Sequence, residues 1–171
     1  PNLAMIPIGV GGAISLFNNA GTTEVIGDVV GYFVPSSGVA GVGAPFTAVT
    51  PTRITDTRTG IGGVRSRFTA GEERIYHVTG LAGVPPIGAR AVVLNLTVTE
   101  PNAVTHLTVW PDGTPQPVAS NLNVVPGETR AVAVVVGLGE GVSADGRFRI
   151  RNNTGNAQVI VDVVGWFGTP P

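Results

Sequence analysis

The chain has 171 residues, enough for one sizeable domain plus an appendage, and its net charge of −1 excludes a general electrostatic attraction to nucleic acid or to an anionic membrane. The absence of cysteine excludes disulfides and cysteine-ligated zinc. With 25 Gly, 14 Pro and only 12% charged residues, the composition indicates many short strands joined by tight turns rather than a disordered chain. We therefore expect an all-β protein without a membrane span, since no apolar run is long enough for one.

The first 34 residues are expected to form an appendage of three strands: Leu3–Ile8, Ala13–Phe17 and Glu24–Phe33. Gly and Asn at the joints accept the positive φ angles of hairpin turns. A sheet of this size has one apolar face and nothing of its own to bury it against, so it should not fold alone. We interpret residues 1–34 as an interaction and assembly element. The alternative is that they belong to an upstream front half outside this sequence.

Residues 35–45 are predicted to be a flexible linker of small residues, and residues 46–168 a complete domain. Turn residues divide this domain into candidate strands: Thr47–Thr57, Arg74–Thr79, Ala91–Thr99, His106–Trp110, Ala119–Val124, Thr129–Val136, Phe148–Arg151 and Gln158–Phe167. Their number and spacing favour an antiparallel β-sandwich of the jelly-roll or immunoglobulin type. A closed barrel or a trefoil is the alternative, because hydrophobic periodicity does not distinguish closure.

An internal repeat links the two parts of the chain. Val25–Phe33 reads VIGDVVGYF and Val159–Phe167 reads VIVDVVGWF. The similarity continues toward the N-terminus and, past a six-residue insertion, pairs Ala4–Gly9 with Val132–Gly137. The first 33 residues therefore correspond only to the back of the complete domain.

Asp162 lies in the repeated strand, between apolar residues on both faces. A buried carboxylate without a partner costs several kcal/mol. The segment TRITDTR from Thr52 supplies Arg53 and Arg58, which could both bind Asp162, with Asp56 between them. We interpret these four residues as a structural ion pair. Asp28 is the repeat of Asp162, yet its own half of the chain has no such segment.

The repeat also predicts the assembly surface. Where the complete domain has arginines beside Phe148 and Ile150, the first copy has small or apolar residues, which suits a covered face. The predicted assembly residues are Ile14, Leu16, Phe17, Asp28, Tyr32 and Phe33.

Arg147, Arg149 and Arg151 occupy one face of a predicted strand. Protection of a sheet edge is the first interpretation, and contact with a cell-wall polysaccharide, together with Trp110, is the second. The sequence contains few candidate catalytic residues. His77 and His106 lie in no metal-ligand spacing, and no nucleophile or phosphate-loop motif occurs. We expect neither catalysis nor a cofactor or metal.

Four stretches carry a resemblance to a known family: FTAVTPTRITDTRTG from Phe46, AVVLNLTVTEP from Ala91, HLTVWPDGTPQPVASNLNVVPGET from His106 and VIVDVVGWF from Val159. With these motifs, residues 46–167 resemble one unit of a tandem β-rich repeat of large secreted and surface proteins of actinobacteria and other bacteria. Residues 2–33 resemble only the back of that unit. The resemblance implies an extracellular spacer, adhesive or wall-associated role, and it brings no catalytic residues.

Taken together, these features predict an extracellular structural repeat protein that joins copies of itself head to tail into a filament or surface array. The alternative prediction is a cell-wall or polysaccharide-binding module of a larger secreted protein.

Overall fold

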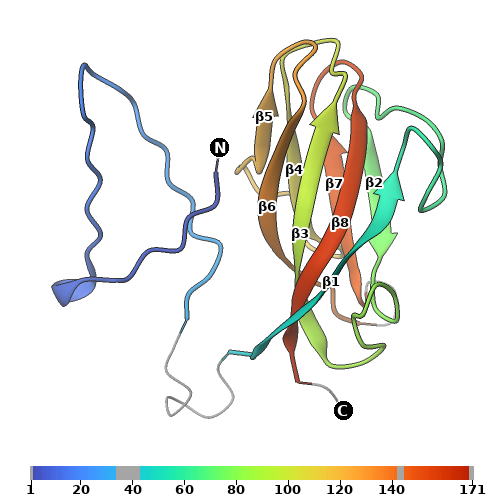
Figure 1. Cartoon of the computed structure of the whole chain (residues 1–171), viewed down its shortest axis with the longest axis horizontal. Helices are drawn as coiled ribbons and strands as arrows, with labels where there is room; N and C mark the ends of the chain where they lie inside the picture. Colours follow the sequence, from blue (N-terminus) through green and yellow to red (C-terminus); the bar gives the residue numbers. More distant parts are fainter. Residues whose placement is uncertain (1, 34–42, 142–144, 170–171) are drawn as a thin grey trace.

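The computed structural model describes residues 2–33, 43–141 and 145–169. From residue 46 onward the chain forms two packed four-stranded sheets (Figure 1). Their strands, in chain order, are β1 (Phe46–Asp56), β2 (Glu73–His77), β3 (Ala89–Thr99), β4 (Thr105–Pro111), β5 (Leu122–Val124), β6 (Arg130–Gly137), β7 (Arg147–Asn152) and β8 (Gln158–Gly168). The strand ends agree with the predicted ones to within three residues.

The order of strands is β1-β8-β3-β6 in one sheet and β2-β7-β4-β5 in the other. Consecutive strands cross between the sheets at every step except β4 to β5, and eight antiparallel strands connected in this way form a jelly roll. The prediction of an all-β sandwich is confirmed. Because the two sheets in the described part of the chain remain separate, the closed barrel and trefoil are excluded.

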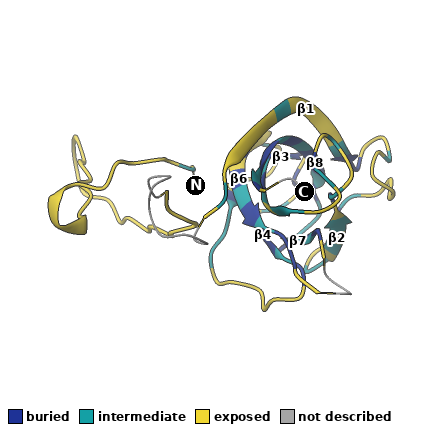
Figure 2. Ribbon diagram, turned by 90° about the horizontal axis from the view of Figure 1, so that it is seen from below, coloured by how far each residue is buried: buried dark blue, intermediate teal, exposed yellow. Residues whose placement is uncertain are grey.

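The core forms because alternate residues of each strand are apolar and face the opposite sheet. In β3, Leu94 and Leu96 are fully buried, and Asn95 between them is half-buried. In the opposite sheet, Phe148 and Ile150 of β7 are fully buried. Figure 2 shows the contrast between this buried interior and the exposed residues that precede the sandwich.

β8 is an interior strand, as the apolar faces of its sequence predict. It pairs with β1 on one side and with β3 on the other, and Val161 and Val163 are buried in the core. The register places Asp162 opposite Arg53 of β1 and Asn95 of β3. The first and last strands of the sandwich are therefore neighbours, and Phe46 at the start of β1 is opposite Phe167 near the end of β8.

Residues 2–33 do not form the predicted three-stranded sheet. Their one regular element is a short 3-10 helix, η1 (Val10–Gly12), and the rest of this range has no strand. Every residue in it except Leu3 is exposed, and the segment lies beside the sandwich rather than over either sheet (Figures 1 and 2). Of the predicted linker, the structure describes only residues 43–45.

The topology explains why this sheet is absent. By the internal repeat, the three ranges expected as strands correspond to β6, β7 and β8. In the sandwich these three strands do not pair with one another, because β6 pairs with β3, β7 with β2 and β4, and β8 with β1 and β3. A segment that carries only their counterparts has no strand to pair with, so its backbone groups stay hydrated.

Candidate interaction site

Arg53 and Asp162 form the ion pair that joins the first and last strands. The Arg53 Nε donates to Asp162 Oδ1 at 2.8 Å, and Nη2 donates to Oδ2 at 3.4 Å. This fork holds the guanidinium in one orientation and raises the pKa of Arg53 through the hydrogen bond to Asp162. The pair is partly hydrated, with 41% of the Arg53 side chain and 18% of the Asp162 side chain exposed.

Arg58 does not reach Asp162, contrary to expectation. It follows the end of β1 at Asp56, and the chain turns there, so its side chain folds back onto Asp56. Its Nε donates to Oδ1 at 2.9 Å and its Nη2 to Oδ2 at 2.8 Å. Arg53 completes the cluster by donating to Asp56 Oδ2 at 3.3 Å. Asp56, rather than Asp162, is the carboxylate shared by two arginines.

Asp56 is buried, and its environment favours the charged form. The hydrogen bonds from the Arg58 side chain lower the pKa of Asp56 to about 2, against the opposing effect of burial. The Asp56 carbonyl accepts the backbone N–H of Gly60 at 2.8 Å, which closes the turn after β1. These contacts give Asp56 a structural role at the end of β1.

The three arginines of β7 are not an unpaired basic stripe. Arg149 Nε donates to Asp112 at 2.6 Å, and Arg151 Nη1 donates to Glu73 at 2.9 Å. Arg149 also approaches Glu73 at 3.3 Å, and Arg147 is engaged in an interaction as well. β7 lies between β2 and β4, so the interpretation of these residues as edge protection is wrong.

Sequence reasoning missed the acidic partners of this face. Glu73 was overlooked because only the register of β2 on β7 places it opposite Arg151. Asp112 lies in the turn after β4, where its carboxylate accepts the backbone N–H of Gly113 at 3.0 Å. Its nearly complete burial and its bond to Arg149 depend on the packing of the turn after β4 against β7.

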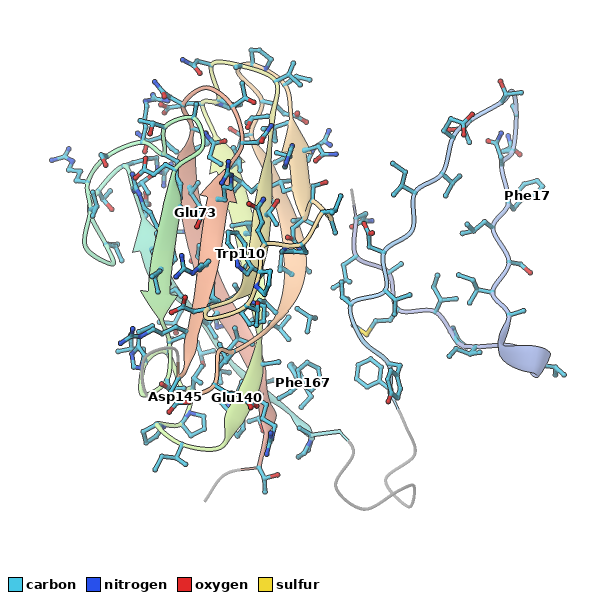
Figure 3. The ribbon with its side chains drawn as sticks, turned by 180° about the vertical axis from the view of Figure 1, so that it is seen from behind. Phe17, Glu73, Trp110, Glu140, Asp145 and Phe167 are labelled. Carbon is cyan, nitrogen blue, oxygen red and sulfur yellow. The ribbon has the colours of Figure 1, made fainter. Side chains whose placement is uncertain are left out.

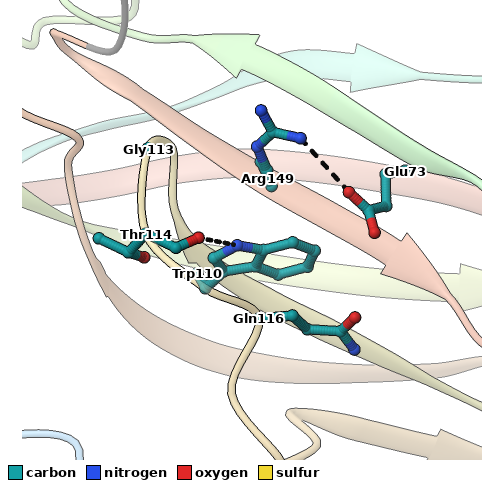
Figure 4. Close-up of a pocket in the computed structure, with 6 residues that line it drawn as sticks. All are labelled: Glu73, Trp110, Gly113, Thr114, Gln116 and Arg149. Atoms are coloured by element: carbon teal, nitrogen blue, oxygen red, sulfur yellow. Dashed lines mark hydrogen bonds and ion pairs between the residues drawn. The ribbon is translucent and has the colours of Figure 1, made fainter.

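Trp110 does not present an open ring for stacking on a sugar. Only 3% of the residue is exposed, and its Nε1 donates to the carbonyl of Thr114 at 3.2 Å (Figure 4). It forms part of the wall of an open surface pocket of about 250 Å³, which is also lined by Glu73, Gln116 and Arg149. Because Arg149 is already held by two carboxylates, this pocket has little free positive charge for an anionic polymer.

The described residues show no group of three or more His, Asp or Glu side chains placed to hold a metal ion. One of the two histidines, His77, exchanges a hydrogen bond with the hydroxyl of Thr79 at 2.9 Å. No helix in the described ranges has the length and apolarity needed to cross a membrane.

The predicted assembly residues are all exposed. Residues 5–33 hold thirteen of the twenty-two exposed large apolar side chains found in the described chain, although they form less than a fifth of it. Phe17, which is 89% exposed, lies on the limb of the segment farther from the sandwich (Figure 3). Among the predicted assembly residues, only Phe33 makes a ring contact within the described chain, at 6.0 Å between its centroid and that of Phe167. This concentration of apolar surface is the principal candidate site.

The other assembly residues include Ile14 and Leu16, which are 53% and 68% exposed, and Tyr32, which is 70% exposed. Asp28 is also exposed, so the structure does not supply a partner for it from the described part of the same chain. A complete sandwich does not shelter these residues within one molecule. Any cover for them comes from outside the described chain.

The fold and the site define an all-β sandwich that carries an exposed apolar segment. Comparisons with protein families, with curated proteins and with solved structures find no match for this chain.

Proposed function

We infer that this protein is a non-catalytic structural repeat protein of the cell exterior, whose units join head to tail into a filament or surface array through residues 2–33. The observation that carries this proposal is the exposed apolar surface of that segment, which a soluble monomer rarely presents. A contact between a segment at one end and a sandwich at the other is heterologous, and such contacts propagate unless the rotation closes them.

Two further observations support a structural role. Most charged side chains of the sandwich form ion pairs with one another. Examples are the cluster of Arg53, Asp56 and Asp162 and the pairs that involve β7. The chain also contains a second copy of the sequence of its last three strands, and such internal repetition is the organisation of a repeat protein. The extracellular location rests on the family resemblance of residues 46–167.

The proposal is tested by measuring mass against concentration for the full chain in sedimentation and by negative-stain microscopy. We expect the full chain to self-associate. Replacing Phe17, Ile26 and Val29 together by Ser should shift it toward monomer, since each is about nine-tenths exposed and none belongs to the sandwich.

A matched control changes three exposed apolar residues of the sandwich, Ile87, Val104 and Val118, to Ser and should leave the association unchanged. If the unaltered chain and the variant lacking residues 1–45 are both compact monomers of equal stability, the proposal is wrong.

A further inference from the structure

We propose that residues 2–33 are the last three strands of a second sandwich, and that their partner is a further five-stranded front of the kind that residues 46–124 form. Here the front means β1–β5, and the back third means β6–β8, residues 130–168. The inference rests on the proposed function in taking residues 2–33 as the joint between units. It adds the identity of the surface that residues 2–33 bind, namely a five-stranded front.

The local turns of the segment already have the conformation found in the back third. Asn18 Nδ2 donates to the carbonyl of Gly21 at 2.8 Å, and Asn152 Nδ2 donates to the carbonyl of Gly155 at the same distance. Gly21 and Gly155, which are repeats of each other, have φ angles of 69° and 60°. The turn forms without a front because its contacts are local.

Asn152 makes further contacts that Asn18 lacks. Its Oδ1 accepts the hydroxyl of Thr105 at 2.8 Å, and its Nδ2 donates to the carbonyl of Thr69 at 3.1 Å. Thr69 and Thr105 both belong to the front. Asn152 is fully buried whereas Asn18 is exposed. Residues 2–33 therefore contain an asparagine whose repeat is buried by a front, although Asn18 itself is not buried in this structure.

Gly31 gives the clearest indication that a front is meant to lie against residues 2–33. Its repeat, Gly165, must be glycine because a Cβ there would overlap the ring of Phe46 and lie 2.9 Å from the carbonyl oxygen of Thr47. Both of those residues are in the front. At Gly31 a Cβ would meet nothing within 4 Å, and its φ is not in the left-handed region. Neither crowding nor backbone conformation in this chain requires glycine at position 31.

Two other glycines carry less weight. A Cβ on Gly146 would overlap Thr79, and one on Gly155 would overlap Ala103, again both front residues. Their repeats Gly12 and Gly21 have nothing within 4 Å of a built Cβ, but φ angles of 78° and 69° favour glycine there by themselves. Gly31 is therefore the glycine that indicates the close approach of a front.

The apolar residues follow the same alternation as the back third. Ile14 and Leu16 repeat the fully buried Phe148 and Ile150 of β7. Asp28 repeats Asp162, whose partner Arg53 is on the front. A front seated on residues 2–33 would bury the apolar side chains and give Asp28 an arginine.

A count of strands decides between possible partners. The described residues contain one front, which is filled by its own back third, and two back-third sequences if residues 2–33 are included. The partner of residues 2–33 is accordingly a front that is not already filled by a back third of its own.

The test is made on the full chain with a copy of residues 46–128 placed directly before Pro1, where the repeat aligns Pro1 with Thr129. Amide hydrogen exchange is measured by mass spectrometry. We expect exchange within residues 2–33 to slow by at least about a hundredfold relative to the unextended chain. We also expect the extended chain to lose the self-association of the full chain.

A positive control shows whether the added front can fold. In it, residues 1–33 of the extended chain are replaced by residues 129–167, whose pairing with a front is known. If this control shows two protected sandwiches and residues 2–33 stay unprotected in the test chain, the inference is overturned.

The variant Gly31→Val tests whether residues 24–33 take the position of β8 on the added front or only make a nonspecific contact with it. In the extended chain it should abolish the protection of residues 2–33, because the side chain would meet the counterpart of Phe46. In the unextended chain it should change nothing. Protection that survives Gly31→Val overturns the inference. Failure of the full chain to self-associate would instead count against the proposed function.

Discussion

The side-chain amide of Asn152 joins β7 to β4 by accepting the hydroxyl of Thr105 at 2.8 Å in the interior of the sandwich. The same side chain donates to three backbone carbonyls, of Thr69, Thr154 and Gly155. All its polar atoms are thus satisfied although the residue is fully buried, which is the condition for a buried amide to stabilise a fold.

Asn152→Ala should lower the free energy of unfolding by about 2 to 4 kcal/mol, because it leaves buried polar groups without partners. Asn18→Ala is the matched control, since Asn18 occupies the repeated position but is exposed. It should change the stability by less than about 0.5 kcal/mol. Denaturant titration of both variants in the full chain measures the difference, and equal effects would contradict this role for Asn152.

The free energy of unfolding should fall in acid because the Asp56 carboxylate becomes protonated. The pKa of this carboxyl is lowered to about 2 in the folded protein from an ordinary value of 3.8. A lowered folded pKa contributes stability above the unfolded pKa, and that contribution, about 2 kcal/mol here, is lost as the pH falls from about 4 to 2. Asp56→Asn should be less stable at pH 7 and should show a shallower loss over that range. The check is thermal unfolding at successive pH values, and parallel curves would argue against it.

Trp110→Ala should act on stability rather than on sugar binding. The ring is almost fully buried, so truncation should cost about 3 kcal/mol or more. Val118→Ala, at a fully exposed residue, serves as the control. Calorimetry gives the stabilities and a pull-down on cell-wall polysaccharide gives the binding. Loss of retention without loss of stability would restore the polysaccharide interpretation.

The ion pair between Arg53 and Asp162 should contribute modestly. A double-mutant cycle with Arg53→Ala and Asp162→Ala should give a coupling of about 1 kcal/mol or less, because the guanidinium is two-fifths exposed and water screens the pair. The coupling should shrink further in 1 M salt. A coupling that is large and independent of salt would show that the pair is less hydrated than its exposure indicates.

The sandwich was largely predictable because each of its strands has a recognisable pattern in its own local sequence. Alternating apolar residues in Ala89–Thr99 and Gln158–Gly168, with turn residues at their ends, place the strands without reference to their partners. Arg53 was matched to Asp162 by a similar argument, since a buried carboxylate requires a cation. Arg58 was misassigned because the direction of its side chain depends on the turn that follows β1.

Residues 2–33 show where the local argument fails. Their alternation and turns are those of strands, yet no strand forms there, since a strand requires a hydrogen-bonded neighbour and the repeated strands are never neighbours of one another. The sequence could not reveal this because strand order is a property of the assembled sheets.

By itself, then, the amino-acid sequence determined the class of fold, the places of strands and turns in residues 46–168, and the existence of a second back third, because these depend on periodicity, turn chemistry and repetition. Only the tertiary structure decided which strands pair, that the arginines of β7 are held by Glu73 and Asp112, and that residues 2–33 are unpaired. Those outcomes depend on contacts between residues far apart in the chain, whose positions are set when the two sheets close on a common core.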